Sequence, residues 1–475
     1  MPIAEASGVG VGTLVADLEL SRAWLVDPAS GREGPGEIVV EDGLLEAVNW
    51  LEADDADGVG PVGVVVAPGF VDLHAHLREP GDEDAETIAS GLAAAAHGGF
   101  TTVCAMANTD PPLDDPGVLG RIRAAAAAAA ADSPVELLAY GTVSTDRAGD
   151  RLAALGELAD AGAVGFSDDG APVRSASLLR AALAYAGMLG LPIVDHAEDL
   201  SLTEGAEANE GLVATILGLR GWPAAAEAAA VARDLAILAG VAVDVPGARL
   251  HLTHLSTADA LEQVRRAKAA GLPVTCDVTP HHLALTDEWL AGGRRWAWEA
   301  RGDVWRDDDV VAPPFDPALR VNPPLRSASD AAAVLAAIAD GTADAIATDH
   351  APHTTVAKQV EFGLAATGIS GIETALGLVL AAVDAGQLPL GRAIQALTTG
   401  PLAVLAGSSR RPVAGLIEGE AADLVVFDRT DAWTVEADSL LSRGTNSPLL
   451  GRTLPGRVLL TIADGRFAYR SPVLD

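Results

Sequence analysis

The chain has 475 residues, of which 49% are hydrophobic and 20% charged, so it can bury a large core. Its 31 basic and 66 acidic residues give a formal net charge of -35, which argues against nucleic acid or an anionic membrane surface as a partner. The beginning, MPIAEASG, lacks signal-peptide features, and no uncharged apolar run approaches the roughly 18 residues of a spanning helix. We therefore expect a folded, cytoplasmic protein.

The two end regions of the chain have strand-turn-strand character. WLVDPASGREGPGEIVVEDGLLEAV lies near the beginning, and ADLVVFD, GRVLLTIADG and RFAYR follow about residue 406. Neither region has enough strands to be stable alone. We predict that residues 1–63 and 406–475 form one small β-module, with residues 64–405 between them.

The middle of the chain alternates short β-branched runs with longer alanine- and leucine-rich amphipathic segments. Tracts such as 124–131 have high helix propensity and predict outer helices. Eight such βα units indicate an α/β fold, a (β/α)8 barrel of the TIM type, with its active site at the carboxyl ends of the strands. The candidate strands are 64–74, 101–108, 135–143, 163–168, 191–196, 248–254, 272–279 and 343–349.

The motif VDLHAHLREP places His74 and His76 two residues apart at the end of the first candidate strand. A strand points alternate side chains to the same face, so both rings can reach one point. Polar residues end the other runs as well, where a barrel would gather them. They are Asn108, Asp168, Asp169, His196, His254, His281, His282 and Asp349.

Convergence of nitrogen and oxygen donors predicts a site for one or two zinc ions. A single histidine or aspartate at a strand end is more often a hydrogen-bonded structural residue, so the prediction depends on at least five strand ends meeting at one mouth. The predicted ligands are His74, His76, Asp169, His196, His254 and Asp349.

Arg78 follows the histidine pair directly. A guanidinium and a metal ion are both positively charged and repel each other unless an anion lies between them. We therefore expect an anionic substrate. The alternative is that Arg78 and Asn108 brace loops through main-chain carbonyls. We expect His97 to contact a helix end and His251 to point away from His254.

Three further features remain separate from the metal site. Cys104 and Cys276 lie far apart in apolar runs and should be buried, reduced thiols. His281 and His282 either line the pocket or brace a loop. Residues 287–320 have no clear period and contain Trp289, Trp296 and Trp305, which predicts a lid or an excursion.

The sequence resembles the amidohydrolase superfamily, and within it the class I dihydroorotases. Matching segments occur in family order across the middle of the chain: PGFVDLHAHLREPG, GGFTTVCAMANTDPP, VGFSDDGAPV, VDHAED, HLTHLST, CDVTPHHL, RVNPPLR and IATDHAPH. The resemblance implies reversible cyclisation of N-carbamoyl-L-aspartate to L-dihydroorotate, a step of pyrimidine (UMP) biosynthesis.

The resemblance also implies residue roles. His74, His76, His196, His254 and Asp349 would bind zinc, with Asp169 as a bridge to a second metal. Asp349 would also be the catalytic proton carrier. Arg78, Asn108 and His353 would hold the substrate carboxylate, with Asn322 in the pocket wall. The family's Met-Pro-Asn-Thr is Met106-Ala107-Asn108-Thr109 here, which makes the loop that places Asn108 less rigid.

Two alternatives remain. A hydantoinase or allantoinase would resemble this barrel but generally uses a carboxylated lysine as metal bridge, whereas the fourth strand offers Asp168 and Asp169 and the chain's lysines are Lys268 and Lys358. The second alternative is a non-catalytic barrel that scaffolds aspartate transcarbamoylase, which a retained ligand set argues against. A homo-oligomer and an aspartate transcarbamoylase complex are both compatible with the sequence.

Overall fold

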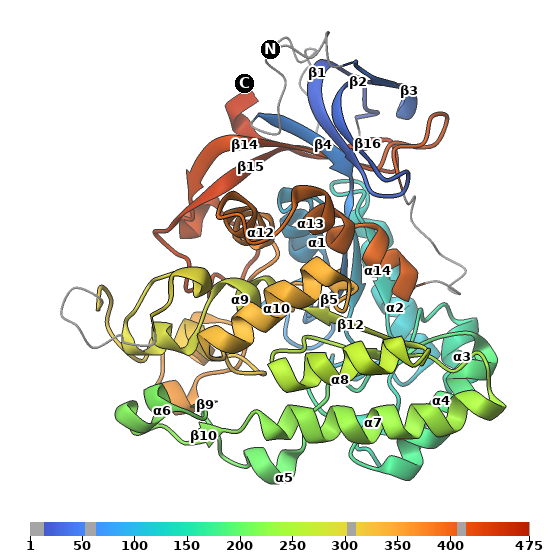
Figure 1. The fold of residues 1–475 in the computed structure, drawn as a ribbon. Coiled ribbons are helices and arrows are strands. Elements are labelled where there is room, and N and C mark those ends of the chain that lie inside the picture. The colour runs from blue at the N-terminus through green and yellow to red at the C-terminus, as the bar shows by residue number, and fades with distance from the viewer. Residues whose placement is uncertain (1–13, 53–62, 302–309, 406–414, 475) are drawn as a thin grey trace.

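A computed structural model describes residues 14–52, 63–301, 310–405 and 415–474 of the chain. Figure 1 shows helices surrounding a set of parallel strands, and a separate layer of strands from both end regions of the chain beside them. Within the described ranges, no helix has the length and apolar character needed to cross a lipid bilayer.

Strands from both end regions of the chain pair in one seven-stranded sheet, as the sequence predicts. The members are β1 (Leu18–Asp27), β2 (Arg32–Glu41), β3 (Leu44–Trp50), β4 (Val64–Pro68), β14 (Leu424–Thr434), β15 (Thr453–Ala463) and β16 (Arg466–Arg470). Their order is β16-β15-β14-β4-β1-β2-β3. β4 joins the two halves because it pairs with β1 on one side and β14 on the other. One face buries an apolar cluster that includes Leu25, Val66 and Ile462.

The run 64–74, predicted as one strand, is two strands in different sheets. β4 ends at Pro68, and β5 (Phe70–Ala75) begins after Gly69. A Cβ atom at Gly69 would lie 2.2 Å from side-chain atoms of Thr101, so the chain passes between the sheets at a position that suits glycine. The prediction was wrong because a continuous apolar run does not mark a change of sheet.

The other long-range strand pairs form two parallel sheets. One contains β5, β6 (Phe100–Ala105) and β7 (Glu136–Ala139). The other has the order β13-β12-β11-β8, with β8 (Ile193–Asp195), β11 (Leu250–Leu252), β12 (Val274–Val278) and β13 (Ala345–Ile346). A separate two-stranded sheet pairs β9 (Ala208–Asn209) with β10 (Gly221–Trp222).

Isolated parallel bridges join the two parallel sheets at both edges. Phe166 bridges to Gly141 after β7 and to Ile193 in β8, and Ala75 bridges to His350 after β13. The described segment 163–168, predicted as the fourth strand, contains only the bridging residue Phe166 and no strand. The turn at Gly170, whose φ is 83°, ends the extended backbone after it.

Helices connect the parallel strands and cover their outer side (Figure 1). Capping side chains begin several of them; for example, Thr87 and Ser175 accept backbone N–H groups of the first turn. The helices are α1 (Ile88–His97), α2 (Pro116–Ala129), α3 (Leu155–Asp160), α4 (Ala176–Leu189), α5 (Leu200–Thr203), α6 (Leu212–Leu217), α7 (Ala225–Asp244), α8 (Ala258–Ala269), α9 (Pro280–Ala284), α10 (Ala328–Asp340), α11 (Thr355–Lys358), α12 (Ala375–Asp384), α13 (Leu390–Leu397) and α14 (Thr399–Val404).

The parallel strands enclose a distinct apolar cluster. Val71 and Leu73 of β5, Met106 just after β6 and Val194 of β8 contribute to it, together with Leu402 of α14. Cys104 belongs to the same cluster, and Cys276 is equally buried in the larger core. Burial raises the pKa of both thiols, so the prediction of two buried, free cysteines is confirmed.

The described part of the 287–320 stretch is packed against the body of the protein. Short 3-10 helices form at Asp287–Ala291, Ala297–Glu299 and Pro317–Leu319. Trp289 is fully buried, and the guanidinium of Arg452 lies 4.7 Å from the ring centre of Trp296. Trp305 lies outside the described residues, so the lid stays a prediction.

Candidate metal centre

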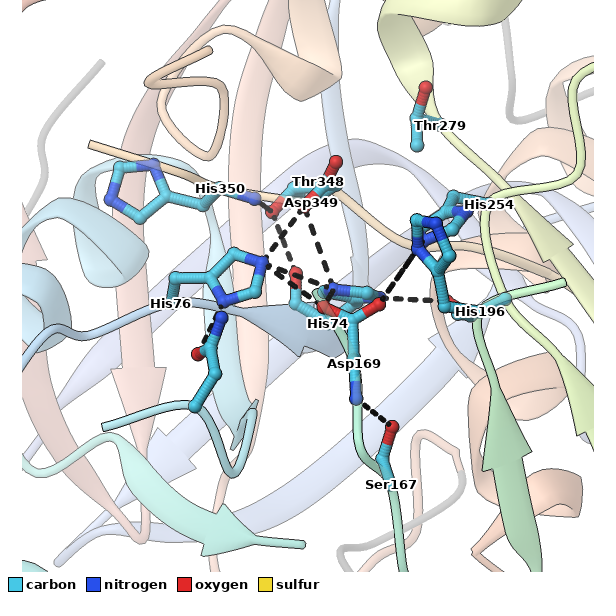
Figure 2. Close-up of polar contacts among 12 residues, drawn as sticks. His74, His76, Ser167, Asp169, His196, His254, Thr279, Thr348, Asp349 and His350 are labelled. Carbon is cyan, nitrogen blue, oxygen red and sulfur yellow. Dashed lines mark hydrogen bonds and ion pairs between the residues drawn. The ribbon is translucent and has the colours of Figure 1, made fainter. Parts of the chain in front are cut away.

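The six side chains predicted as metal ligands meet at the carboxyl ends of the parallel strands (Figure 2). All six are buried. Because they come from different strand ends, the fold brings together residues that are far apart in the sequence. Their positions are His74 in β5, His76 just after β5, Asp169 after the bridging Phe166, His196 after β8, His254 after β11 and Asp349 after β13.

His74, His76 and Asp169 form the first group with metal-binding geometry. The Nε2 atoms of the two imidazoles are 3.3 Å apart. Asp169 Oδ2 lies 3.1 Å from His74 Nε2 and 3.5 Å from His76 Nε2. Asp349 Oδ1 lies 3.2 Å from His76 Nε2 and 3.5 Å from His74 Nε2. Two nitrogen and two oxygen donors therefore converge, a set that a divalent cation such as zinc accepts.

Asp169, His196 and His254 form the second group. His196 Nδ1 lies 3.0 Å from His254 Nε2. Asp169 Oδ1 lies 3.4 Å from His196 Nδ1 and 3.2 Å from His254 Nε2. Three protein donors leave room for a further ligand, which is typical of catalytic metal sites.

Asp169 belongs to both groups because its two carboxylate oxygens face in different directions (Figure 2). Oδ2 approaches His74, whereas Oδ1 approaches His196 and His254. A carboxylate in this position would reduce the repulsion between two neighbouring dications. The residues therefore fit a centre of two metals that share Asp169, and the first group alone fits a single metal.

The ring nitrogens that face away from the cluster have partners of their own. An acceptor takes the N–H of an imidazole and leaves the lone pair of the other nitrogen for the metal. The metal-facing nitrogens are then Nε2 of His74, Nε2 of His76 and Nδ1 of His196. The three outer pairs are His74 Nδ1 with Thr253 Oγ1 at 2.7 Å, His76 Nδ1 with Asn108 Oδ1 at 2.9 Å, and His196 Nε2 with Glu198 Oε2 at 3.0 Å.

Glu198 and Thr253 were missed by sequence reasoning. Burial opposes ionisation of Glu198, but the hydrogen bond and charge of His196, together with hydrogen bonds from Thr203 and Asn322, outweigh burial and lower the pKa of the carboxyl. Glu198 is two residues after His196 on extended chain, and this spacing could have indicated a supporting carboxylate. The hydroxyl of Thr253 in turn donates a hydrogen bond to Asp277. The carboxylate of Asp277 also accepts the backbone N–H of His254 at 2.6 Å.

The centre is a buried anionic pocket. Burial disfavours the charged form of His74, yet Asp169 outweighs this effect and the pKa of His74 is raised to about 9. Burial likewise opposes charge on His196, but Asp169 and Glu198 raise its pKa to about 10. These buried carboxylates stabilise positive charge on the neighbouring imidazoles. A bound divalent cation would be stabilised by the same carboxylates.

Three predicted site residues have a left-handed backbone. The φ angles are 61° at Arg78, 41° at His254 and 47° at Asp349. For residues with a Cβ atom this conformation costs on the order of 1–3 kcal/mol. Such strain at three positions of one site is typical of a region shaped by function.

The residues predicted to bind substrate lie on two sides of the metal groups. Arg78 Nη2 is 3.2 Å from His353 Nε2, and Arg78 Nε donates to the carbonyl of Pro352 at 3.0 Å. Burial and Arg78 lower the pKa of His353 to about 3, so its ring is neutral. The oxygen of Asn108 is bonded to His76, and Asn322 Nδ2 donates to Glu198 Oε2 at 3.3 Å.

Several histidines outside the metal groups have structural partners. His251 belongs to neither metal group and contacts Asp277 at 2.7 Å. The expectation for His97 was wrong: its Nδ1 lies 2.6 Å from Glu373, which comes from a segment too distant for local sequence to indicate. His282 braces the loop through the carbonyl of Pro323 at 3.1 Å.

The neighbours of the bridge do not compete with Asp169. Asp168 Oδ1 accepts the backbone N–H groups of Val143 and Ser144, so its carboxylate holds the segment that follows β7. Lys268 pairs with Asp344, and Lys358 donates to backbone carbonyls that include those of Pro317 and Ala366. Neither lysine contacts the two metal groups.

Comparison with solved structures identifies the fold. An L-hydantoinase (dihydropyrimidinase) from Arthrobacter aurescens superposes with a TM-score of 0.76 and 24% identity over 96% of each chain. A D-hydantoinase superposes with a TM-score of 0.72 and 21% identity over 96% of each chain. At these identities the likeness concerns the fold. The chain therefore shares the fold of these hydantoinases, and its two candidate metal groups lie within that fold.

Sequence comparison identifies the family. Residues 63–260 match the family model described as Dihydro-orotase-like. A dihydroorotase from Anaeromyxobacter dehalogenans (strain 2CP-1 / ATCC BAA-258) is 46% identical over 95% of this chain and 97% of its own length. Another, from Pelotomaculum thermopropionicum (strain DSM 13744 / JCM 10971 / SI), is 40% identical over 96% of this chain and 99% of its own. The chain belongs to the dihydroorotase family of cyclic amide hydrolases.

Proposed function

We propose that this protein is a zinc-dependent dihydroorotase that interconverts N-carbamoyl-L-aspartate and L-dihydroorotate in pyrimidine (UMP) biosynthesis. The observation that carries the proposal is the pair of histidine groups that share Asp169, with Arg78 and His353 beside them. The family assignment supports the same reaction.

We also propose that the two parallel sheets close into a (β/α)8 barrel. The bridges at Phe166 and between Ala75 and His350 support closure at both edges. Residues 64–405 would form this barrel and residues 1–63 and 406–475 the β-module. The pairing of β4 with β1 and β14 favours a first boundary near Gly69 instead of residue 64.

One or two zinc ions would be held by the predicted ligands His74, His76, Asp169, His196, His254 and Asp349. A bound divalent zinc supplies Lewis acidity, which polarises the ring amide carbonyl and lowers the pKa of water. The surrounding residues keep the donors oriented: Thr253, Asn108 and Glu198 each take the outward N–H of one imidazole.

Asp349 would carry the proton. In hydrolysis, its carboxylate takes a proton from the attacking water and returns it to the ring nitrogen as the carbon–nitrogen bond breaks. In cyclisation, the same carboxylate takes a proton from the ureido nitrogen, which attacks the side-chain carboxyl carbon, and the proton leaves with the released water. The left-handed backbone of Asp349, with φ of 47°, supports a dedicated orientation of this group.

Arg78, Asn108 and His353 would bind the substrate carboxylate, and Asn322 would form part of the pocket wall. Arg78 is a suitable anion binder because its guanidinium offers several N–H donors in a fixed plane. His353 lies within hydrogen-bond distance of Arg78, so both can approach one anion. Asn322 lies near Glu198, on the opposite side of the centre.

Two alternative functions, a hydantoinase or allantoinase and a non-catalytic scaffold, agree less well with the structure. A hydantoinase or allantoinase would need a bridging lysine, and Lys268 and Lys358 lie elsewhere. A purely structural scaffold would have no use for two complete ligand groups. The proposal includes a cytoplasmic location, and it is compatible with a homo-oligomer or a complex with aspartate transcarbamoylase.

The proposal is tested by assaying the purified protein against dihydroorotate, hydantoin and allantoin, with metal content measured on the same sample. We expect turnover of dihydroorotate and of N-carbamoyl-L-aspartate, with zinc bound. Preference for hydantoin or allantoin, or full activity without any bound metal, would contradict it.

A further inference from the structure

Arg78 and His353 depend on one short loop. Residues 351–353 follow β13, and this loop carries His353 itself. The carbonyl of Pro352 accepts a hydrogen bond from Arg78 Nε at 3.0 Å. The position of the loop therefore sets the position of both side chains at the substrate end of the site.

Asn446 holds this loop from a distant part of the chain. Its Oδ1 accepts the backbone N–H of His353 at 2.8 Å. Its Nδ2 donates to the carbonyls of Ala351 at 3.1 Å and Gly368 at 3.0 Å. The residue is buried, with 8% of its surface exposed. One side-chain amide thus satisfies three backbone groups around His353.

The orientation of the Asn446 amide is fixed by its partners. The N–H of His353 requires an acceptor, and the carbonyls of Ala351 and Gly368 require donors. A rotated amide would place donor against donor and acceptor against acceptor. No other residue type offers this combination at the same length, because aspartate has no donor when ionised and alanine has neither group.

The segment around Asn446 approaches the loop closely at a second point. A Cβ atom at Gly444 would lie 2.5 Å from Pro352 Cβ and 2.7 Å from the backbone nitrogen of His353. Gly368 is equally tight, since a Cβ there would lie 2.5 Å from Ala351 Cβ and 3.1 Å from His353 Nε2. Backbone contacts of this kind leave the loop little freedom to move.

We infer that Asn446 is a positioning residue for substrate binding: it fixes residues 351–353 so that Arg78 and His353 present their nitrogens to the substrate carboxylate. The inference rests on the proposed function, which assigns that carboxylate to these two side chains. Among the contacts of the described residues, Asn446 makes none to the six predicted metal ligands. Its effect on catalysis should therefore pass through substrate binding and leave metal binding intact.

The test compares Asn446→Ala and Asn446→Asp with the wild type in their zinc-loaded forms. We expect KM for dihydroorotate to rise by about tenfold or more, kcat to change by less than about threefold, and zinc per chain to stay the same. The Asp variant keeps the acceptor for His353 but loses both donors, so it should behave like the Ala variant. Hydrogen exchange of the His353 amide should become faster in the Ala variant, which lacks the acceptor.

Asn209→Ala is the matched control. Asn209 is also a buried amide, bonded to Asp287 and Arg326, but it does not contact residues 351–353. Its replacement should lower stability without the rise in KM. Should the Asn446 variants not fold, Gly444→Ala examines the same contact, because the added methyl group would displace Pro352 and His353.

The possible results separate the inference from the proposed function. An active, zinc-loaded Asn446 variant with wild-type KM would overturn the inference alone, even if the His353 amide exchanges faster. Loss of zinc from the variant would also overturn it, because Asn446 would then support the metal end. A wild-type protein that does not convert dihydroorotate would overturn the proposed function, and the inference with it.

Discussion

The two ends of the site are held by different kinds of structure. The metal end consists of side chains at the ends of parallel strands, and three of its imidazoles have an outer partner within 3.0 Å. The substrate end consists of Arg78 and His353, which depend on an irregular loop and on Asn446. At strand ends, the sheet itself determines where a side chain lies. In a loop, the position of a side chain depends on contacts with particular residues distant in sequence. Mutations should therefore separate the two ends by their effects on metal content and on KM.

The largest effect is expected at the metal end from Asp349→Asn. The change keeps the size of the side chain but removes the proton acceptor, so turnover should fall by about a thousandfold or more. The thermal unfolding midpoint should stay close to that of the wild type, which controls for folding. Turnover within tenfold of the wild type would refute the role of Asp349.

The proposed metal bridge can be tested by comparing Asp169 with its neighbour Asp168, because the two carboxylates have different partners. Asp169→Ala removes a ligand from both metal groups, so zinc per chain or turnover should fall sharply. Asp168→Ala is the matched control: it removes bonds to the backbone of Val143 and Ser144 and should mainly reduce stability. Equal loss of zinc in both variants would count against a bridge at Asp169.

Removal and return of the metal tests the chemistry of the bridge. A lysine could bridge two cations only after reaction with carbon dioxide, whereas Asp169 has a permanent charge at neutral pH. Activity after chelation and zinc reloading should therefore not depend on added bicarbonate. Recovery that requires bicarbonate, or a lysine carrying extra mass in the intact protein, would show that this assignment is wrong.

At the substrate end, Arg78→Lys should raise KM by about tenfold or more, with smaller changes in zinc content. Lysine keeps the positive charge but cannot make two parallel hydrogen bonds to a carboxylate. Measuring KM and zinc on the same preparation separates the two ends of the site. Loss of zinc with unchanged KM would place Arg78 among the supports of the metal.

The smallest effect concerns residues 287–320. We expect substrate to slow proteolytic cutting of this stretch if it covers the site, and the packing of Trp289 and Trp296 suggests that cutting will be confined to part of it. Cutting at equal rates with and without dihydroorotate would argue against a lid.

The metal end was largely predictable from the sequence. The period of a strand places His74 and His76 together, and βα alternation places His196, His254 and Asp349 at the same edge. The division of residues 64–74 at Gly69 was not predictable, because both halves are apolar and glycine alone does not show a change of sheet. The predicted fourth strand, 163–168, is reduced to isolated bridges at Phe166, although its backbone still bonds to the segments on both sides.

The substrate end was predicted only in part. Arg78 and His353 could be named from resemblance, but nothing near them in sequence indicates what holds them. Asn446 is about 90 residues from His353, and its role depends on three backbone groups that only the folded chain brings together. Glu198 differs in being local, since its distance of two residues from His196 could have been recognised.

The seven-stranded sheet has a consequence for how the protein is made. Val65 of β4 pairs with Trp24 of β1, which is synthesised before it, and with Phe427 of β14, which is synthesised long after it. At about 5 to 20 residues per second, the ribosome needs on the order of 20 to 70 seconds to make the intervening chain. Throughout that time one edge of an apolar strand has no native neighbour, and open edges promote aggregation. The nascent chain is therefore most vulnerable before β14 emerges, and the loop of His353 gains its contacts with Asn446 only after β14 has been made.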